Sequence, residues 1–190
     1  KTPKNRKWVE FKIYDKAKFS DGKNITSKDV IFSWETLKNS GRPHTRSYYS
    51  MIKETKEINN KTVRFYFSEK GNFELPLIIG LMPIFHSIYW KNKEITKTTL
   101  EPFISSGPYK IINIAPGRSI TYAKNKDWWN KDSKDSLGRN NFKKIKYDFY
   151  RDQNIALEAF LSGEFDINIE TDAVRWKNSY RHNSKRKIIK

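Results

Sequence analysis

Short segments in which apolar and polar residues alternate constrain this chain more than any other feature. Val9, Phe11 and Ile13 fall on one face of an extended segment, and Val63, Phe65 and Phe67 repeat the pattern. A period of two is typical of half-buried β-strands. Strands are predicted over 8–14, 62–68, 108–114, 118–124, 143–150 and 165–170, and helices over 27–38 and 152–162. Strands that alternate with capped helices predict an α/β structure.

The segment from Ala17 to Leu37, AKFSDGKNITSKDVIFSWETL, joins the first predicted strand to the first predicted helix. Its Asp-Gly pair is typical of a turn, and Thr26 with Asp29 three residues later matches a capping box. An EF-hand needs oxygen ligands at alternate positions before its glycine and a glutamate further on, which this segment does not supply. Asp21 and Asp29 are therefore interpreted as turn and cap residues, and no metal site is predicted.

Three other segments carry specific predictions. NSGRPHTRSYYS (residues 39–50) is polar with two aromatics, which is typical of a loop that faces a ligand. GNFELPLIIGLMPIF (71–85) predicts a short apolar helix that starts near Asn72, with Pro76 in its first turn. Trp128 and Trp129 are predicted to anchor an irregular polar segment.

The net charge of +17 permits two interpretations. Such an excess favours nucleic acid, an anionic membrane surface or an acidic ligand as a partner. Lysine, however, far outnumbers arginine and is scattered along the chain, as codon bias in an AT-rich genome would produce. Nucleic-acid readers more often cluster arginine, whose fork matches phosphate and guanine. A basic nucleic-acid-binding module is the alternative function, and only the net charge favours it.

Catalytic patterns are missing from the sequence. It has no GxSxG, HExxH, Walker or GxGxxG motif, and the absence of cysteine excludes disulfides, thiolate zinc sites and thiol catalysis. His44, His86 and His182 lie far apart, which favours surface or packing roles. The chain is therefore predicted to be a binding protein, neither an enzyme nor dependent on a cofactor, with an aromatic-rich α/β frame for a ligand cleft.

Three blocks, in order, resemble family 5 extracellular solute-binding proteins, the peptide- and nickel-binding subunits of ABC importers. They are KFSDGKNITSKDVIFSWETL (18–37), SSGPYKI (105–111) and ALEAFLSGEFDINIE (156–170). Further phrases, such as GNFELPLIIG and YDFYRDQNIALEAF, are most similar to the oligopeptide and microcin-C (Yej-type) branch. The resemblance extends from about Trp8 to Asp172.

The resemblance implies a type 2 periplasmic-binding-protein fold, of which this chain is a partial first lobe with a mixed β-sheet. Residues 1–100 correspond to the smaller subdomain of that lobe, 101–172 to part of its core, and 173–190 to a basic tail leading toward a second lobe. The implied function is the capture of oligopeptides in the periplasm for an ABC permease of the inner membrane. A signal peptide and the second lobe are expected to lie outside this sequence, and self-association is expected from the surfaces they leave uncovered.

Two regions are implied as ligand contacts. Relatives place an aromatic residue of the TRSYYS segment near the ligand, which makes Tyr48 or Tyr49 a candidate, although packing against Trp34 is the expected role for at least one of them. The residues after the last predicted strand also reach ligand in relatives; here they are Ile169, Glu170, Thr171 and Asp172. The two acids suit an ammonium or guanidinium group, or else pair with neighbouring lysines.

Overall fold

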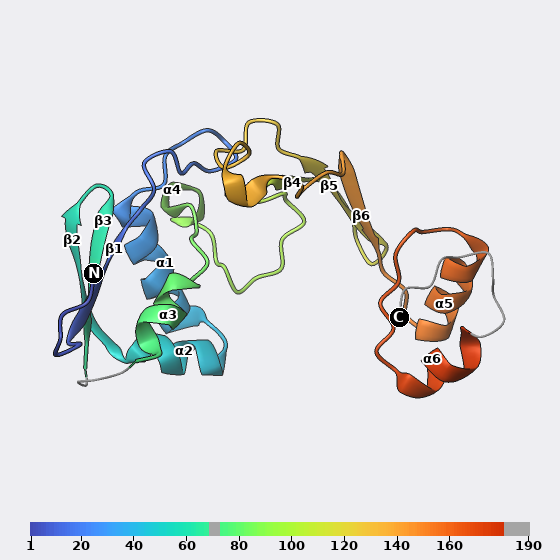
Figure 1. Cartoon of the computed structure of the whole chain (residues 1–190), viewed down its shortest axis with the longest axis horizontal. Coiled ribbons are helices and arrows are strands. Elements are labelled where there is room, and N and C mark those ends of the chain that lie inside the picture. Colours follow the sequence, from blue (N-terminus) through green and yellow to red (C-terminus); the bar gives the residue numbers. More distant parts are fainter. Residues whose placement is uncertain (69–72, 181–190) are drawn as a thin grey trace. The chain divides into compact units, whose positions relative to one another are not determined.

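The structure is a computed structural model that describes residues 1–68 and 73–180 of the chain (Figure 1). It divides into two compact units. The first contains residues 1–114 and 120–146, and the second contains residues 115–119 together with the chain from Tyr147 onward. Within the described residues, none of the helices has both the length and the apolar character needed to cross a membrane.

The first unit contains a three-stranded sheet of β1 (Trp8–Lys12), β2 (Ile52–Asn59) and β3 (Thr62–Phe67), in the order β1-β3-β2. Both pairings are antiparallel, and Val9 lies opposite Phe65. These strands confirm the two predictions made from alternation. β2 was not predicted, because IKETKEIN has charged residues at half of its positions, and only Ile52 among its side chains is buried.

Helices cover one face of this sheet: α1 (Ser27–Ser40), α2 (Pro43–Ser50) and α3 (Leu75–Gly80), while the four-residue α4 (Ser87–Trp90) contacts α1 (Figure 1). The core between helices and sheet is centred on Ile52, Val63, Phe65 and Leu75, each exposed by 1% or less. Because burying such side chains is the dominant favourable term in folding, this core fixes the positions of α2 and α3.

Helix α2 corrects one prediction. Residues 39–50 were expected to form a loop, but Pro43 occupies the first turn of a helix that continues to Ser50. Proline suits that position because its missing N–H would have no partner there. Helix α3 confirms the predicted short apolar helix, with Pro76 in its first turn, although it begins at Leu75; the expected start near Asn72 lies outside the described residues.

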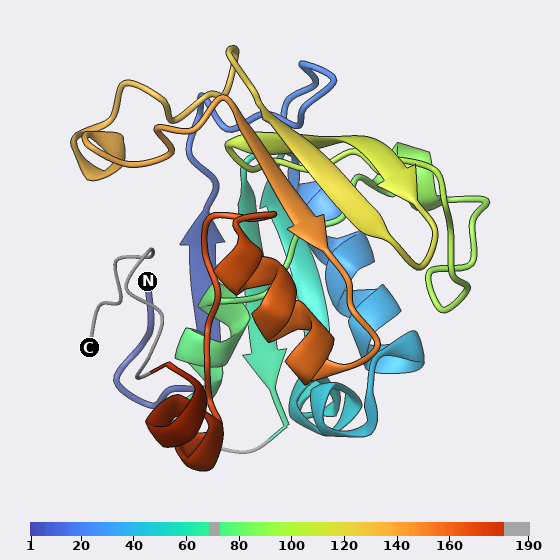
Figure 2. The same cartoon turned by 90° about the vertical axis from the view of Figure 1, so that its right-hand side faces the viewer.

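A second sheet contains β4 (Tyr109–Ala115), β5 (Ser119–Lys124) and β6 (Lys144–Asp148), which lie side by side in that order (Figure 2). All three were predicted. The indole N–H groups of Trp128 and Trp129 both donate to the carbonyl oxygen of Ser106, at 3.0 and 3.2 Å. The two tryptophans are therefore anchors, as predicted, and they hold the SSGPYKI segment. A short 3-10 helix, η1 (Lys134–Ser136), follows them.

The second unit contains α5 (Gln153–Ser162) and α6 (Ala173–Ser179). Asp152 caps α5 by accepting the amide N–H of Asn154 at 2.7 Å, and Gly163 ends the helix with a φ of +95°. Leu157, Phe160 and Tyr180 form the core of this unit. Helix α5 matches the prediction almost residue for residue.

The prediction of a strand over residues 165–170 is wrong. This segment has no partner strand among the residues that the structure describes, and it forms no regular element. Asn168 turns inward instead: its side-chain amide donates to the hydroxyl of Tyr180 at 2.7 Å. Ile167 and Ile169 are left 70% and 83% exposed.

Candidate functional site

The two tyrosines at the end of α2 have opposite environments. Tyr49 points into the core and is 5% exposed, whereas Tyr48 is 43% exposed. The indole N–H of Trp34 donates to the carbonyl oxygen of Tyr49 at 3.2 Å, which joins α1 to α2. Burial raises the pKa of the Tyr49 phenol. Of the pair, Tyr49 thus has the packing role, and Tyr48 is the one whose ring is available to a ligand.

The second candidate region, residues 169–172, precedes and caps α6. The side chain of Glu170 is only 5% exposed, and its two carboxylate oxygens each lie 3.3 Å from Nη1 of Arg175. One of them also accepts the backbone N–H of Asp172 at 2.8 Å. Ile169 and Thr171 are exposed. Glu170 therefore has an internal cation as its partner, where the sequence suggested a ligand or a neighbouring lysine.

Asp172 is the more accessible of the two acids. It accepts the backbone N–H of Arg175 at 2.8 Å, and its side chain is 47% exposed. The hydrogen bond from that amide, aided by the positive guanidinium of Arg175, lowers the pKa of Asp172. Glu170, Asp172 and Arg175 together carry one net negative charge at neutral pH. The arrangement could attract a cationic group, which would meet it at Asp172.

Arg175 is the residue that sequence reasoning missed. Its guanidinium is 20% exposed and reaches Glu170, Gln153 and Asp172. The available signal was its spacing: a basic residue three positions after an acidic helix cap lies within reach of that cap. The sequence left two alternatives for these acids, a cationic ligand group or neighbouring lysines, and among the described residues the cation that pairs with them is Arg175.

The turn around Asp21 is structural. Asp21 accepts the backbone N–H of Lys23 at 3.1 Å, and its other carboxylate oxygen lies 3.2 Å from Nε2 of His86. The His86 ring is buried and stacks on Phe19, with ring centroids 4.6 Å apart. Within residues 1–68 and 73–180, no group of three or more acidic or histidine side chains is arranged to hold a metal ion.

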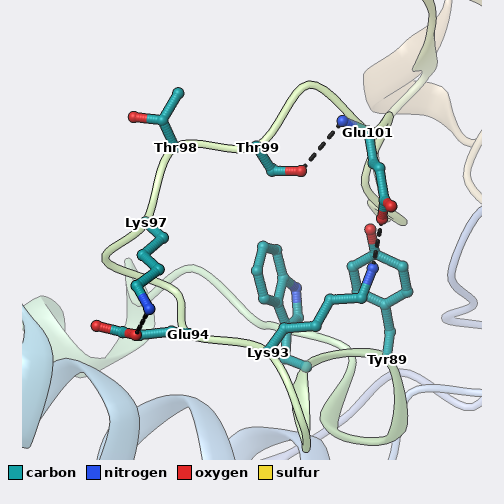
Figure 3. A pocket seen from close by; sticks show the side chains of 8 residues that line it. Tyr89, Lys93, Glu94, Lys97, Thr98, Thr99 and Glu101 are labelled. Carbon is teal, nitrogen blue, oxygen red and sulfur yellow. Dashed lines mark hydrogen bonds and ion pairs between the residues drawn. The ribbon is translucent and has the colours of Figure 1, made fainter.

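A shallow pocket of about 290 Å³ lies on the segment that contains and follows α4 (Figure 3). Its charged side chains are engaged with one another: Lys93 pairs with Glu101 at 2.6 Å, and Lys97 with Glu94 at 2.7 Å. The Lys93 ammonium also lies 4.2 Å from the centre of the Tyr89 ring. The pocket therefore offers aromatic surface, and its charged side chains already neutralise one another. The residues predicted from the sequence as ligand contacts do not line it.

The fold defines the class of protein to which this chain is similar. It superposes on the oligopeptide-binding protein AppA from Bacillus subtilis, solved in complex with a nonapeptide, with a TM-score of 0.74 and 24% sequence identity. The match covers 96% of this chain and 36% of AppA. The fold is therefore that of part of a type 2 periplasmic binding protein.

The family follows from sequence. The model of bacterial extracellular solute-binding proteins, family 5, middle region, matches residues 1–189, so the chain belongs to this family. It is 38% identical over 177 residues to a probable peptide-binding protein, YejA, from Agrobacterium fabrum, covering 90% of this chain and 29% of the relative. It is 36% identical over 185 residues to YejA from Escherichia coli K12, covering 96% and 30%. The chain thus spans less than a third of the length of these relatives.

Proposed function

We propose that this chain is part of a periplasmic subunit that captures oligopeptides and delivers them to an ABC permease. The observation that carries the proposal is the family match over residues 1–189, combined with a relative that is named for peptide binding. Tyr48 and residues 169–172 are the proposed ligand contacts. Binding requires no covalent chemistry: extended peptides are held by backbone hydrogen bonds and a few charged contacts, and hinge closure buries them.

The experiment is a titration of the chain with mixed tri- to pentapeptides, followed by calorimetry and by two-dimensional NMR, with light scattering on the same samples. A two-lobed binder divides its ligand contacts between the two lobes, so this chain should bind peptide weakly, with a dissociation constant in the millimolar range. Its uncovered apolar surfaces should make it self-associate at high protein concentration. Submicromolar binding by a monomer would show that the chain carries a complete site and that the assignment to one partial lobe is wrong.

A parallel titration with random duplex DNA at two salt concentrations tests the alternative that the net charge suggests. Binding to DNA releases counterions, so its affinity falls steeply with salt. We expect peptide to shift NMR signals and DNA to have at most a weak effect that salt removes. Tight DNA binding with a steep salt dependence, and no response to peptide, would overturn the proposed function.

A further inference from the structure

His86 is 2% exposed, and both nitrogens of its ring have partners. Nδ1 accepts the backbone N–H of Tyr89 at 3.3 Å, which caps α4. Nε2 lies 3.2 Å from a carboxylate oxygen of Asp21, which belongs to a turn 65 residues earlier in the sequence. The buried imidazole therefore joins that turn to the start of α4.

These two contacts define the protonation state of the ring. A backbone N–H can only donate, so Nδ1 must present its lone pair to Tyr89, and a carboxylate can only accept, so Nε2 must carry the hydrogen. The contacts thus assign the neutral tautomer that is protonated on Nε2. A cationic imidazole has a hydrogen on each nitrogen and no acceptor, so it cannot accept the Tyr89 N–H in any orientation.

The surroundings of the ring allow it to become charged. The charged side chains around it and its neighbours come from three elements: Asp21 and Lys23 from the turn, Asp29 from the start of α1, which binds Ser87, and Lys93 from the segment after α4, which lies over the Tyr89 ring. Partial burial opposes ionisation of Asp21, but the backbone N–H of Lys23 and the contact with His86 outweigh it and lower the pKa of Asp21. Asp21 is therefore a carboxylate in mild acid, and it can offset a positive ring.

The residues beside His86 have attachments of their own. The backbone N–H of Phe85 donates to the hydroxyl of Ser33 at 2.7 Å, and Ser87 donates to Asp29. Neither contact involves the imidazole, so a change in its charge leaves residues 85 and 87 attached to α1. The change acts instead on Tyr89, whose side chain lines the pocket of Figure 3.

We propose that His86 is a pH-sensitive cap of α4. As a neutral ring it holds the backbone of Tyr89, and as a cation it releases Tyr89 while its Nε2–H still donates to Asp21, now as a charge-assisted hydrogen bond. Gain of a proton thus loosens α4 and the pocket that α4 helps to line. Histidine is the side chain that ordinarily changes charge between about pH 5 and 8. The inference goes beyond the proposed function, because no peptide takes part in it.

The test is NMR of the isotope-labelled chain at pH 7.5 and 5.5. Long-range proton–nitrogen spectra at pH 7.5 should show the His86 ring with its hydrogen on Nε2. Hydrogen exchange of the Tyr89 amide, corrected for the intrinsic dependence of exchange on pH, should show protection that is about fivefold lower at pH 5.5. That is the change expected for the loss of one hydrogen bond.

Two variants identify the titrating group. Asparagine is a favoured cap whose side-chain oxygen accepts at both pH values, so His86→Asn should give the Tyr89 amide the same protection at pH 7.5 and 5.5. His44→Asn is the matched control, because His44 is exposed on α2. It should retain the fivefold response, and a dispersed spectrum will show that each variant is folded.

The amides of β3 distinguish local opening from general loss of structure, and they should keep their protection at both pH values. A parallel loss in β3 would show that the chain opens as a whole and would overturn the inference. A hydrogen on Nδ1 of His86 at pH 7.5, or equal protection of Tyr89 at both pH values in the unmodified chain, would overturn it as well. A response that survives His86→Asn would assign the titration to another group. The proposed function is tested by its own peptide titration and is unaffected by these outcomes.

Discussion

The carboxylate of Asp29, in the first turn of α1, accepts two hydrogen bonds from Ser87, one from its backbone N–H at 2.9 Å and one from its hydroxyl at 2.7 Å. The other oxygen of Asp29 accepts the backbone N–H and the hydroxyl of Thr26, each at 2.8 Å. Asp29 is 4% exposed. The residue predicted as half of a capping box therefore also connects the start of α1 to the start of α4.

Asp29→Ala should destabilise the first unit by about 3 kcal/mol, because it leaves the half-buried donors of Thr26 and Ser87 without their acceptor, and an unsatisfied buried donor costs about 1–3 kcal/mol. Thr26→Ala should cost about 1 kcal/mol, the typical loss for a helix cap. Lys28→Ala, at the exposed position between them, is the control and should stay within about 0.5 kcal/mol. Urea unfolding measures all three. Equal losses for Asp29→Ala and Thr26→Ala would show that the Ser87 contact contributes nothing.

Lowering the pH should destabilise the first sheet, because Glu10 becomes protonated. Its carboxylate accepts hydrogen bonds from Nη2 and Nε of Arg64 on the adjacent strand, at 2.8 and 3.2 Å. These bonds, with the positive charge of Arg64, lower the pKa of Glu10 from its usual 4.5 and outweigh the opposing effect of burial. The unfolded chain thus binds a proton at a higher pH than the folded chain does. The contribution of Glu10 is complete above pH 4.5 and is lost as the pH falls through the lower folded pKa.

Urea midpoints at pH 6, 4.5 and 3.5 will measure this effect, with Glu10→Gln as the comparison. The wild-type chain should lose more stability over this range than the variant, which has no carboxyl group to titrate at that position. Exposed carboxylates affect both proteins alike, so they cancel in the difference. Parallel pH profiles for the two proteins would mean that the Glu10–Arg64 pair does not form.

Tyr49 of α2 should titrate late in alkali. Burial raises the pKa of Tyr49 above its usual 10.0, because the phenolate loses more solvation than the phenol. Followed by phenolate absorbance, Tyr49→Phe should remove a group that titrates late. Since Tyr49 ionises less readily in the folded chain than in the unfolded chain, its contribution to stability is lost as the pH rises above 10. If Tyr49→Phe instead removes a group that titrates at or below the usual 10.0, the phenol of Tyr49 is not buried as the structure has it.

Local patterns predicted most of the regular elements because each of those patterns has a local cause. Alternation identified β1, β3 and the second sheet, and the Asp152 cap with Gly163 bounded α5. The α2 segment was misread because serine, threonine and proline favour loops on average. What makes it a helix is burial of Tyr49 beside Trp34, which is a tertiary contact that composition does not reveal.

The error over residues 165–170 has a different origin. Alternation describes a surface that fits a strand, but a strand also needs a neighbouring backbone to accept and donate its hydrogen bonds. Ile167 and Ile169 fulfil the first condition and lack the second among the described residues. Likewise, the sequence identifies Glu170 and Asp172 as two neighbouring charges. Their contact with Arg175 depends on the path of the chain into α6, which the sequence pattern does not reveal.

An ion pair between Glu170 and Arg175 holds the candidate residues of the second unit. Arg175→Leu should loosen residues 169–172, because it leaves the carboxylate of Glu170, 5% exposed, without its cation. Removing one member of a shielded pair is costly since the other charge stays behind uncompensated. Glu170→Gln together with Arg175→Leu should therefore be less damaging than the sum of the single changes, with a coupling of about 1 kcal/mol or more.

Hydrogen exchange followed by mass spectrometry over residues 165–180 measures the opening of this segment directly, and Lys177→Leu, at an exposed position of the same helix, is the control. A coupling near zero would show that Glu170 does not depend on Arg175. Its carboxylate would then be available to an incoming ammonium group, which would move the proposed cation contact from Asp172 to Glu170.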